Sequence, residues 1–267
     1  MASPIIQAAD LDPYITEFYR GTMSCLQQAG MPFLVGGAFA LNHYTGIKRD
    51  TKDLDVFVRP EDCPAALQIL TDAGYETELV FEHWLGKVYS EGAFLDVIFS
   101  SGNGVARVDD DWFRHAVDGE ILGLPVQLCP VEETIWSKSF VLERERYDGA
   151  DVAHLLRACG AHLDWERLLK RFDANGAVLF SHLVLFTFIY PGEASLVPAW
   201  VLEELWARLQ RERGRPVRSK ICRGTLLSRE QYLMDIDKWG YQDGRLEPRA
   251  CMTPRQIADW TAGIDFD

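Results

Sequence analysis

The sequence predicts an α+β fold, in which a small mixed β-sheet with flanking helices precedes a mostly helical C-terminal region. Up to about residue 129, short apolar runs alternate with stretches of helical spacing, and glycine or proline separates many of them. After Pro130 the pattern is helical over five successive stretches. This change predicts two parts, a core over residues 1–129 and a helical region over residues 130–267.

The first elements of the core are set by capping and turn residues. Asp12 and Pro13 open a helix, because aspartate caps a helix and proline fits its first turn, and Gly30 closes it. The apolar run 33–35 predicts a buried strand that ends in a tight Gly36-Gly37 turn. The remaining core elements are predicted as a helix over 38–44, a strand at 54–58, a helix over 60–73, strands at 75–80, 85–90 and 94–99, a helix over 109–117 and a strand at 121–128.

The helical region is predicted as helices over 131–143, 148–159, 165–172, 177–189 and 198–213. The most apolar stretch, residues 177–190, is short for a bilayer span and carries Ser181, His182 and Thr187. It therefore predicts a buried helix, and we expect no membrane partner. The tail after residue 230 carries no pattern that predicts more than packing.

The amino-acid composition excludes several classes of protein. Hydrophobic residues make up 48% and charged residues 25%, which excludes a disordered chain. Lys and Arg number 27 against 40 Asp and Glu, and the net charge of −13 argues against a uniformly basic coat for nucleic acid. Six scattered cysteines without a Cys-x-x-Cys pair predict reduced thiols, and no secretory pattern opens the chain. We expect a cytoplasmic protein.

Three aspartates stand on predicted strands. Asp53 and Asp55 alternate along one strand, which places both carboxylates on one face about 6–7 Å apart. Asp96 lies inside a later apolar strand, where a lone carboxylate is costly unless it is paired or liganded. If the two strands are neighbours, three carboxylates converge, and Mg²⁺ prefers oxygen ligands of this kind.

Each feature also has a simpler interpretation. An Asp-x-Asp pair is commonly a solvated strand edge, a Gly-Gly pair is commonly only a turn, and Asp96 could form an ion pair with a nearby Arg or Lys. Gly36-Gly37 stands between a strand and a helix, where backbone amides can hold a phosphate. The combination of the turn with the three acids is more specific than any of its parts.

These motifs resemble the nucleotidyltransferase superfamily of DNA polymerase β. The likeness is strongest to bacterial stand-alone nucleotidyltransferases, which include abortive-infection toxins and often carry an Arg-x-Thr-x-Asp-x-Asp pattern. The pattern is matched by Arg49, Thr51, Asp53 and Asp55, after the run Val35-Gly36-Gly37-Ala38. The resemblance covers residues 33–160. Many members have serine where this chain has Gly37, so one hydroxyl contact to phosphate is absent here.

The resemblance implies roles for these residues. Gly36 and Gly37 would hold the triphosphate of a nucleotide such as ATP, with Arg49 and Thr51 as further nucleotide contacts. Asp53 and Asp55 would bind two Mg²⁺ ions, and Asp96 would be the third ligand or the general base. The implied reaction is an in-line displacement that moves a nucleoside monophosphate to a hydroxyl of RNA, a protein or a small molecule.

Two basic features extend this hypothesis. In the resembled branch a helical lysine contacts phosphate, which would be Lys138 here; a surface salt bridge is the alternative. Asp148 and Asp151 share a helix face and either cap that helix or support the site.

The segment 208–229 carries a charge of +7, against −20 for the rest of the chain. A solvated charged loop is the simple interpretation, and contact with a polyanion is the one we favour, with these candidates: Arg215, Arg218, Lys220 and Arg223.

Two other functions fit the same motifs. The chain could be a non-catalytic module that kept the fold and binds a nucleotide or a partner. It could also be the toxin of a toxin–antitoxin pair. The six histidines show neither metal-ligand spacing nor a Ser/His/Asp arrangement, so a hydrolytic triad is not supported. The sequence carries no signal for the oligomeric state.

Overall fold

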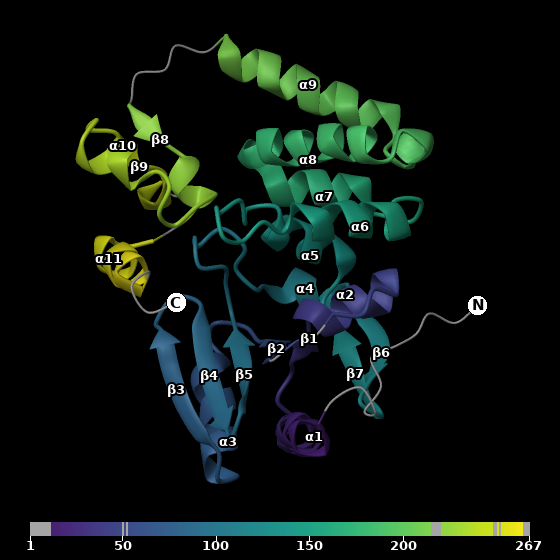
Figure 1. Cartoon of the computed structure of the whole chain (residues 1–267), viewed down its shortest axis with the longest axis vertical. Coiled ribbons are helices and arrows are strands. Elements are labelled where there is room, and N and C mark those ends of the chain that lie inside the picture. The colour runs from purple at the N-terminus through teal and green to yellow at the C-terminus, as the bar shows by residue number, and fades with distance from the viewer. Residues whose placement is uncertain are drawn as a thin grey trace. The chain divides into compact units, whose positions relative to one another are not determined.

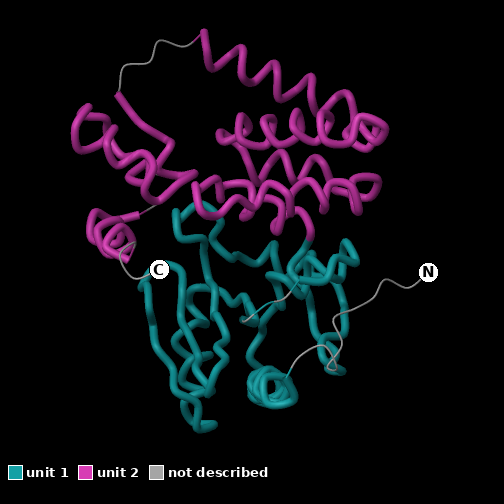
Figure 2. The backbone as a smooth tube through the Cα atoms, viewed as in Figure 1, with its two compact units in different colours: residues 1–130 teal, residues 131–267 magenta. Residues whose placement is uncertain are grey.

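The fold is described by a computed structural model that covers residues 12–49, 51, 53–214, 220–247, 250 and 252–263. The chain divides into two compact units, Met1–Pro130 and Val131–Asp267 (Figure 2). This division lies one residue after the predicted end of the core. That the two units act as separate functional domains stays a prediction.

Unit 1 is built on a seven-stranded mixed sheet (Figure 1). The strand order is β3-β4-β5-β2-β1-β7-β6, and the pairs β2/β5 and β1/β7 are parallel while the others are antiparallel. The strands are β1 Leu34–Val35, β2 Asp53–Phe57, β3 Glu76–Phe81, β4 Leu85–Ser90, β5 Ala93–Ile98, β6 Val117–Ile121 and β7 Leu124–Leu128. The α+β class is confirmed.

In the described residues of unit 1, four helices accompany this sheet: α1 Pro13–Gln28, α2 Gly37–Thr45, α3 Cys63–Asp72 and α4 Asp110–Arg114. Asp12 caps α1 as predicted, since its carboxylate accepts a hydrogen bond of 2.8 Å from the Tyr14 amide. Buried side chains of α1 and α3 form one core with the alternate strand residues Leu54 and Leu95. The opposite face of β2 and β5 stays partly exposed, and the polar strand residues lie there.

One part of the predicted core was wrong. The expected helix over 109–117 ends at Arg114, and the expected single strand at 121–128 is the second half of a β6–β7 hairpin. The hairpin turns at Leu122 and Gly123, which both have positive φ, 52° and 76°. Two positive φ values are typical of a type I′ turn, but Leu-Gly is not its usual sequence, so the pattern hid the turn.

Unit 2 contains the five predicted helices, as α5 Val131–Lys138, α6 Gly149–Cys159, α7 Trp165–Phe172, α8 Gly176–Ile189 and α9 Ala199–Arg213. The first is shorter than predicted. After Lys138 the chain turns back, and a bridge between Leu142 and Tyr147 replaces the expected last turn of helix.

The prediction that α8 is a buried helix was only half correct. Leu183 and Phe186 are fully buried, whereas Phe188 is 83% exposed and Ile189 is 45% exposed. With α7 and a short 3₁₀ turn, α8 forms a 25-residue segment, Trp165–Ile189, that is long and apolar enough to span a membrane. About a third of its most apolar window is buried inside the protein, and core helices of soluble proteins also meet this criterion.

The last part of unit 2 contains small elements that the sequence pattern did not predict. They are β8 Ile221–Cys222, α10 Leu233–Asp237, β9 Gln242–Asp243 and α11 Pro254–Ala262, with short 3₁₀ turns between them. A buried ion pair of 2.7 Å joins Arg245 to Asp243, and Thr225 donates a hydrogen bond to the same carboxylate. These elements are short and buried polar contacts contribute to their packing, so apolar periodicity gave little sign of them.

Candidate active site

The carboxylates of Asp53, Asp55 and Asp96 converge in unit 1. One oxygen of each lies within 4.8 Å of one oxygen of the others, and all three side chains are partly exposed. This is the convergence that the sequence predicts if the two acidic strands are neighbours. The functional roles assigned to the three residues remain predictions.

The register of β2 against β5 produces the cluster. The two strands are parallel neighbours, and Asp55 pairs directly with Asp96 while Asp53 pairs with Phe94. Leu54 and Leu95 point to the opposite face and are fully buried. Paired residues in adjacent strands share a face, so burial of the leucines on the core side leaves the acids on the open side.

The glycine turn lies directly against Asp55. Gly36 caps the start of α2, and its amide donates a hydrogen bond of 3.0 Å to the Asp55 carbonyl oxygen. Gly37 has a φ of +55°, and a Cβ there would lie 1.6 Å from Asp55 Oδ2. A Cβ at Gly36 would lie 2.3 Å from the Phe57 ring. Glycine at position 37 therefore leaves room for the Asp55 carboxylate at the start of α2, and glycine at position 36 leaves room for the Phe57 ring.

Thr51 and Arg49 are placed differently from each other. The Thr51 hydroxyl donates to Asp53, at 2.5 Å to Oδ1 and 3.1 Å to the carbonyl oxygen. Thr51 therefore orients an acid of the cluster, whatever contact it also makes with a nucleotide. Arg49 is exposed. Nucleotide contacts of both residues stay predictions.

A lysine that the sequence analysis did not single out pairs with the third acid. Lys87 Nζ lies 3.0 Å from Asp96 Oδ1, and the two side chains are 23% and 14% exposed. The simpler interpretation of Asp96, an ion pair with a nearby base, is thus part of the structure. Lys87 was missed because its nearness to Asp96 depends on the β4–β5 register.

Tyr19 of α1 is also coupled electrostatically to the cluster. Its side chain is fully buried, and in the described part of the chain its hydroxyl has no hydrogen-bond partner. Burial raises the pKa of Tyr19 far above its usual value, and the negative charges of Asp53, Asp55 and Asp96 raise it further. Its phenol therefore stays protonated, and its helical position among apolar residues gave no sign of this coupling.

The donor chemistry of the cluster fits a divalent cation such as Mg²⁺. All three donors are carboxylate oxygens, which are the hard ligands that Mg²⁺ selects. Three carboxylates this close repel one another strongly, and a cation offsets that repulsion. Asp53 and Asp55, with Asp96, are the residues that would hold it.

The family can now be stated. The family described as "Uncharacterised nucleotidyltransferase" matches residues 23–188, more than half of the chain. The chain belongs to this nucleotidyltransferase family. The matched residues include the glycine turn and all three clustered acids. The predicted resemblance to the nucleotidyltransferase superfamily is confirmed.

Several solved structures are similar to this chain at low identity. They include the antibiotic-resistance factor ANT(2'')-Ia, at 17% identity over 64% of this chain and 98% of that one, with a TM-score of 0.45. Lincomycin-bound LnuA, a lincosamide antibiotic adenylyltransferase, matches at 17% identity over 52% of this chain and 94% of its own, with a TM-score of 0.39.

A third similar structure is an antigenic nucleotidyltransferase-like protein from Paracoccidioides brasiliensis. It is 13% identical over 70% of this chain and 93% of its own, with a TM-score of 0.44. No protein with a curated description matches the sequence of this nucleotidyltransferase.

In unit 2 of the nucleotidyltransferase, Lys138 forms two largely buried ion pairs. Its Nζ lies 2.8 Å from Asp148 Oδ2 and 2.8 Å from Asp151 Oδ2. Burial alone would lower the pKa of Lys138, but the two carboxylates outweigh it and raise the pKa. The salt-bridge alternative is therefore observed, although Asp148 is partly buried and Asp151 is buried, so the pairs are not surface ones. Phosphate contact by Lys138 stays a prediction.

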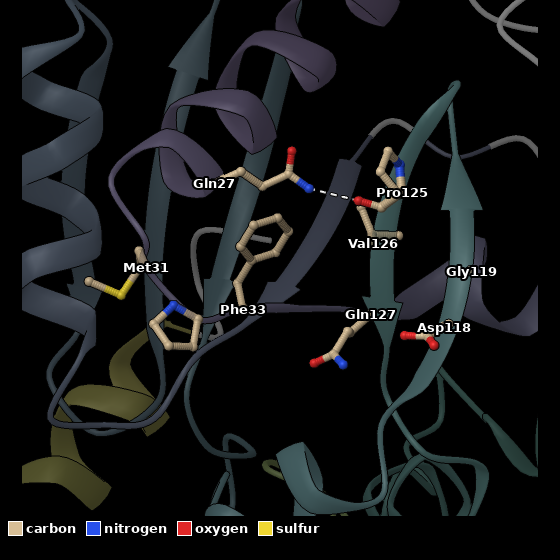
Figure 3. Close-up of a pocket in the computed structure, with 9 residues that line it drawn as sticks. Gln27, Met31, Phe33, Asp118, Gly119, Pro125, Val126 and Gln127 are labelled. Carbon is tan, nitrogen blue, oxygen red and sulfur yellow. Dashed lines mark hydrogen bonds between the residues drawn. The ribbon is translucent and has the colours of Figure 1, made fainter.

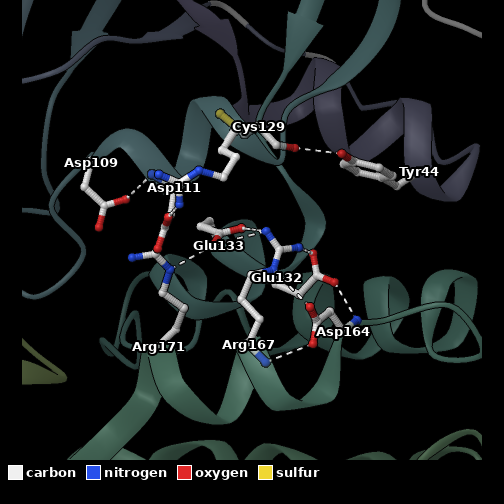
Figure 4. Close-up of polar contacts among 10 residues, drawn as sticks. Tyr44, Asp109, Asp111, Cys129, Glu132, Glu133, Asp164, Arg167 and Arg171 are labelled. Carbon is white, nitrogen blue, oxygen red and sulfur yellow. Dashed lines mark hydrogen bonds and ion pairs between the residues drawn. The ribbon is translucent and has the colours of Figure 1, made fainter.

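A second buried network in unit 2 joins α5 to α7 (Figure 4). Glu133 is fully buried, with its carboxylate 2.8 Å from Arg171 Nε and 3.2 Å from Arg167 Nη1. Glu132 accepts a 2.7 Å hydrogen bond from the Asp164 amide. These contacts satisfy buried charge within the unit, so we interpret the network as a structural one.

The predicted polyanion contacts are partly described. Arg215 and Arg218 lie outside the described residues. Lys220 donates to the Trp239 carbonyl oxygen, and Arg223 forms a 2.6 Å ion pair with Glu247. Contact with a polyanion would have to compete with these internal partners, so it stays a prediction for all four residues.

The acid cluster does not line either of two pockets in the described part of the chain. One, of about 350 Å³, is lined mainly by residues before β1 and in the β6–β7 hairpin, such as Phe33 and Gln127 (Figure 3). Phe33 precedes β1 and Gly36 follows it, so this pocket and the glycine turn lie at opposite ends of that strand. The other, of about 300 Å³, lies between α8 and α9.

Proposed function

We propose that this nucleotidyltransferase is active and Mg²⁺-dependent, and that it transfers a nucleoside monophosphate from an NTP to a hydroxyl acceptor. The observation that supports the proposal most strongly is the position of three carboxylates on neighbouring strands against a glycine turn that opens a helix. Family membership supports the same reaction class. RNA, a protein or a small molecule would be the acceptor.

The residues have distinct tasks in this proposal. The acceptor oxygen attacks the α-phosphorus of the NTP, the bond from that phosphorus to the bridging oxygen breaks, and pyrophosphate leaves. Bound Mg²⁺ would offset charge on the phosphates and lower the pKa of the acceptor hydroxyl. Asp53 and Asp55 would hold the metal, and Asp96 would be a third ligand or take the acceptor's proton.

The backbone amides of the glycine turn would bind the triphosphate. Gly36 and Gly37 open α2, where the helix dipole favours an anion. The Gly36 amide already donates to the Asp55 carbonyl oxygen, so the amides from Gly37 onward would be the phosphate donors. Because neither residue has a side chain, a phosphate can approach the backbone closely. Thr51 would keep the Asp53 carboxylate oriented through the hydrogen bond already formed.

The test is transfer of label from an α-labelled NTP in the presence of Mg²⁺, over pools of RNA, protein and small hydroxyl compounds. The double variant Asp53→Asn, Asp55→Asn should lose labelling and pyrophosphate release together. Glu76→Gln is the matched control, because Glu76 is an exposed acid on β3 outside the cluster. Undiminished labelling by the double variant would refute the assignment.

Calorimetry separates the enzyme from a binding module on the same fold. The enzyme should bind an NTP and release pyrophosphate once a suitable acceptor is present. NTP binding without Mg²⁺-dependent pyrophosphate release in any acceptor pool would favour the module instead.

A further inference from the structure

We propose that Lys87 is a positioning residue for Asp96, holding this carboxylate in the geometry in which it serves the metal and the acceptor. This inference rests on the proposed function, and it concerns a residue on β4 that the reaction described above does not use. Register, a direct ion pair, an aromatic contact and the local charge balance support it.

The register of the sheet brings the two side chains together. Lys87 of β4 pairs directly with Asp96 of β5 in an antiparallel ladder, and Asp96 pairs with Asp55 of β2. Directly opposed residues point to the same face of a sheet. Lys87, Asp96 and Asp55 therefore form one row across three strands, with the lysine beside the third acid.

Two contacts with β5 hold Lys87. Its Nζ lies 3.0 Å from Asp96 Oδ1 and 3.9 Å from the centroid of the Phe94 ring. Phe94 stands two residues before Asp96 on the same strand, so a cation–π contact and an ion pair fix the same ammonium group. A lysine with 23% of its side chain exposed has lost much of its rotational freedom. The contact is thus prepared before any ligand binds.

The charge balance explains why Asp96 needs such a partner. Without a nearby cation, its carboxylate is repelled by Asp53 and Asp55, whose oxygens lie within 4.8 Å. Rotation away from the cluster would relieve that repulsion and remove the third ligand. Lys87 lies on the β4 side of Asp96, opposite Asp55, so the ion pair fixes Oδ1 on that side and limits rotation of the carboxylate. A carboxylate has a second oxygen with which to serve a metal or accept a proton.

A simpler view of Lys87 predicts the opposite effect on metal binding. If Lys87 were only a competing positive charge, its removal would make the cluster more negative and tighten cation binding. If it positions Asp96, its removal weakens cation binding, as loss of partners that orient metal ligands commonly does, by about 10–100-fold. The sign of the change therefore distinguishes the two.

The experiment is calorimetric titration of the full chain with Mn²⁺ alone, as a stand-in for Mg²⁺. Lys87→Met should weaken Mn²⁺ binding by about 10–100-fold, and Lys87→Arg, which keeps the charge, should restore most of it. Glu78→Gln is the matched control for a charge change next to Lys87. Glu78 pairs with Lys87 from β3 and is outside the acid cluster, so its replacement should leave Mn²⁺ affinity unchanged. Thermal melts of all variants identify any loss of folding.

The outcomes separate this inference from the proposed function. Unchanged or tighter Mn²⁺ binding by Lys87→Met, with binding abolished by Asp53→Asn, Asp55→Asn, would overturn the role of Lys87 and leave the metal site standing. Mn²⁺ binding that survives in the double aspartate variant would refute the proposed function itself. If Lys87→Met fails to fold, Lys87→Arg is compared with Asp96→Asn. Mn²⁺ binding by Lys87→Arg that is as weak as binding by Asp96→Asn also contradicts the inference.

Discussion

Gly37 and Asp55 are packed so closely that a Cβ at position 37 would lie 1.6 Å from Asp55 Oδ2. The contact joins the start of α2 to the second acid of β2, two features that the sequence presents as separate motifs. It means that the glycine turn does more than change the direction of the chain. It leaves room for the carboxylate beside backbone amides that we expect to hold phosphate.

Replacement of Gly37 by alanine should therefore damage the site. In Gly37→Ala the methyl group collides with Asp55, so we expect Mn²⁺ binding and nucleotidyl transfer to fall together. The matched control is Gly30→Ala, because Gly30 also has a positive φ, +68°, but has nothing within 4 Å of its would-be Cβ. Both variants carry the backbone cost of about 1–2 kcal/mol, and only Gly37→Ala should lose metal binding.

Removal of Lys138 should destabilise unit 2. Lys138→Met leaves the partly buried Asp148 and the buried Asp151 without their shared cation, and the loss of one partner of a buried pair costs up to about 3–5 kcal/mol. Urea unfolding followed by fluorescence measures the change, with Lys170→Met, an exposed lysine on α7, as the control. Unchanged stability with weakened NTP binding would instead favour the phosphate contact that the sequence suggested.

The same pair gives a defined dependence on pH. Burial opposes the charge of Asp148, but Lys138 and Arg146 outweigh it and lower the pKa of Asp148 below its usual 3.8. The unfolded state then binds more protons near that pH, so this contribution to stability is complete above about 3.8 and is lost as the pH falls further. We expect the free energy of unfolding to fall less steeply in Lys138→Met as the pH drops below about 3.8.

His182 should make unit 2 less stable in mildly acidic solution. Burial lowers the pKa of His182 below 6.5. Its Nε2 lies 2.9 Å from the Ser139 carbonyl oxygen, and this contact raises the pKa but by less than burial lowers it. The unfolded chain takes up a proton first, so stability is complete above about pH 6.5 and declines as the pH falls. His182→Gln should reduce this slope, whereas His162→Gln, at an exposed position, should leave it unchanged. An equal slope in all three proteins would contradict the prediction.

The local pattern of the sequence was sufficient to predict the strands that carry the acids and the face that each strand buries. Alternation in Asp53-Leu54-Asp55 and around Asp96 predicts which side chains are buried, and the structure agrees. The pattern could not show that β2 and β5 are neighbours, since β3 and β4 lie between them in sequence. That pairing comes from the topology of the whole sheet.

Long-range register accounts for what sequence reasoning missed at the site. Lys87 stands nine positions before Asp96, and only the β4–β5 ladder places the two side by side. Tyr19 reads as one more buried aromatic residue of α1, and its electrostatic coupling to the acids requires the folded arrangement. Local signals therefore identified the acidic residues, while the residues that support them depended on tertiary structure.

The most direct test of the proposed site is a crystal structure with Mn²⁺ and a non-hydrolysable NTP. We expect anomalous peaks among the oxygens of Asp53, Asp55 and Asp96, at roughly the 2.0–2.2 Å typical of metal–carboxylate bonds, with the triphosphate at the Gly36-Gly37 turn, on the amides that begin α2. A nucleotide bound elsewhere, with no metal among these three carboxylates, would contradict the proposal.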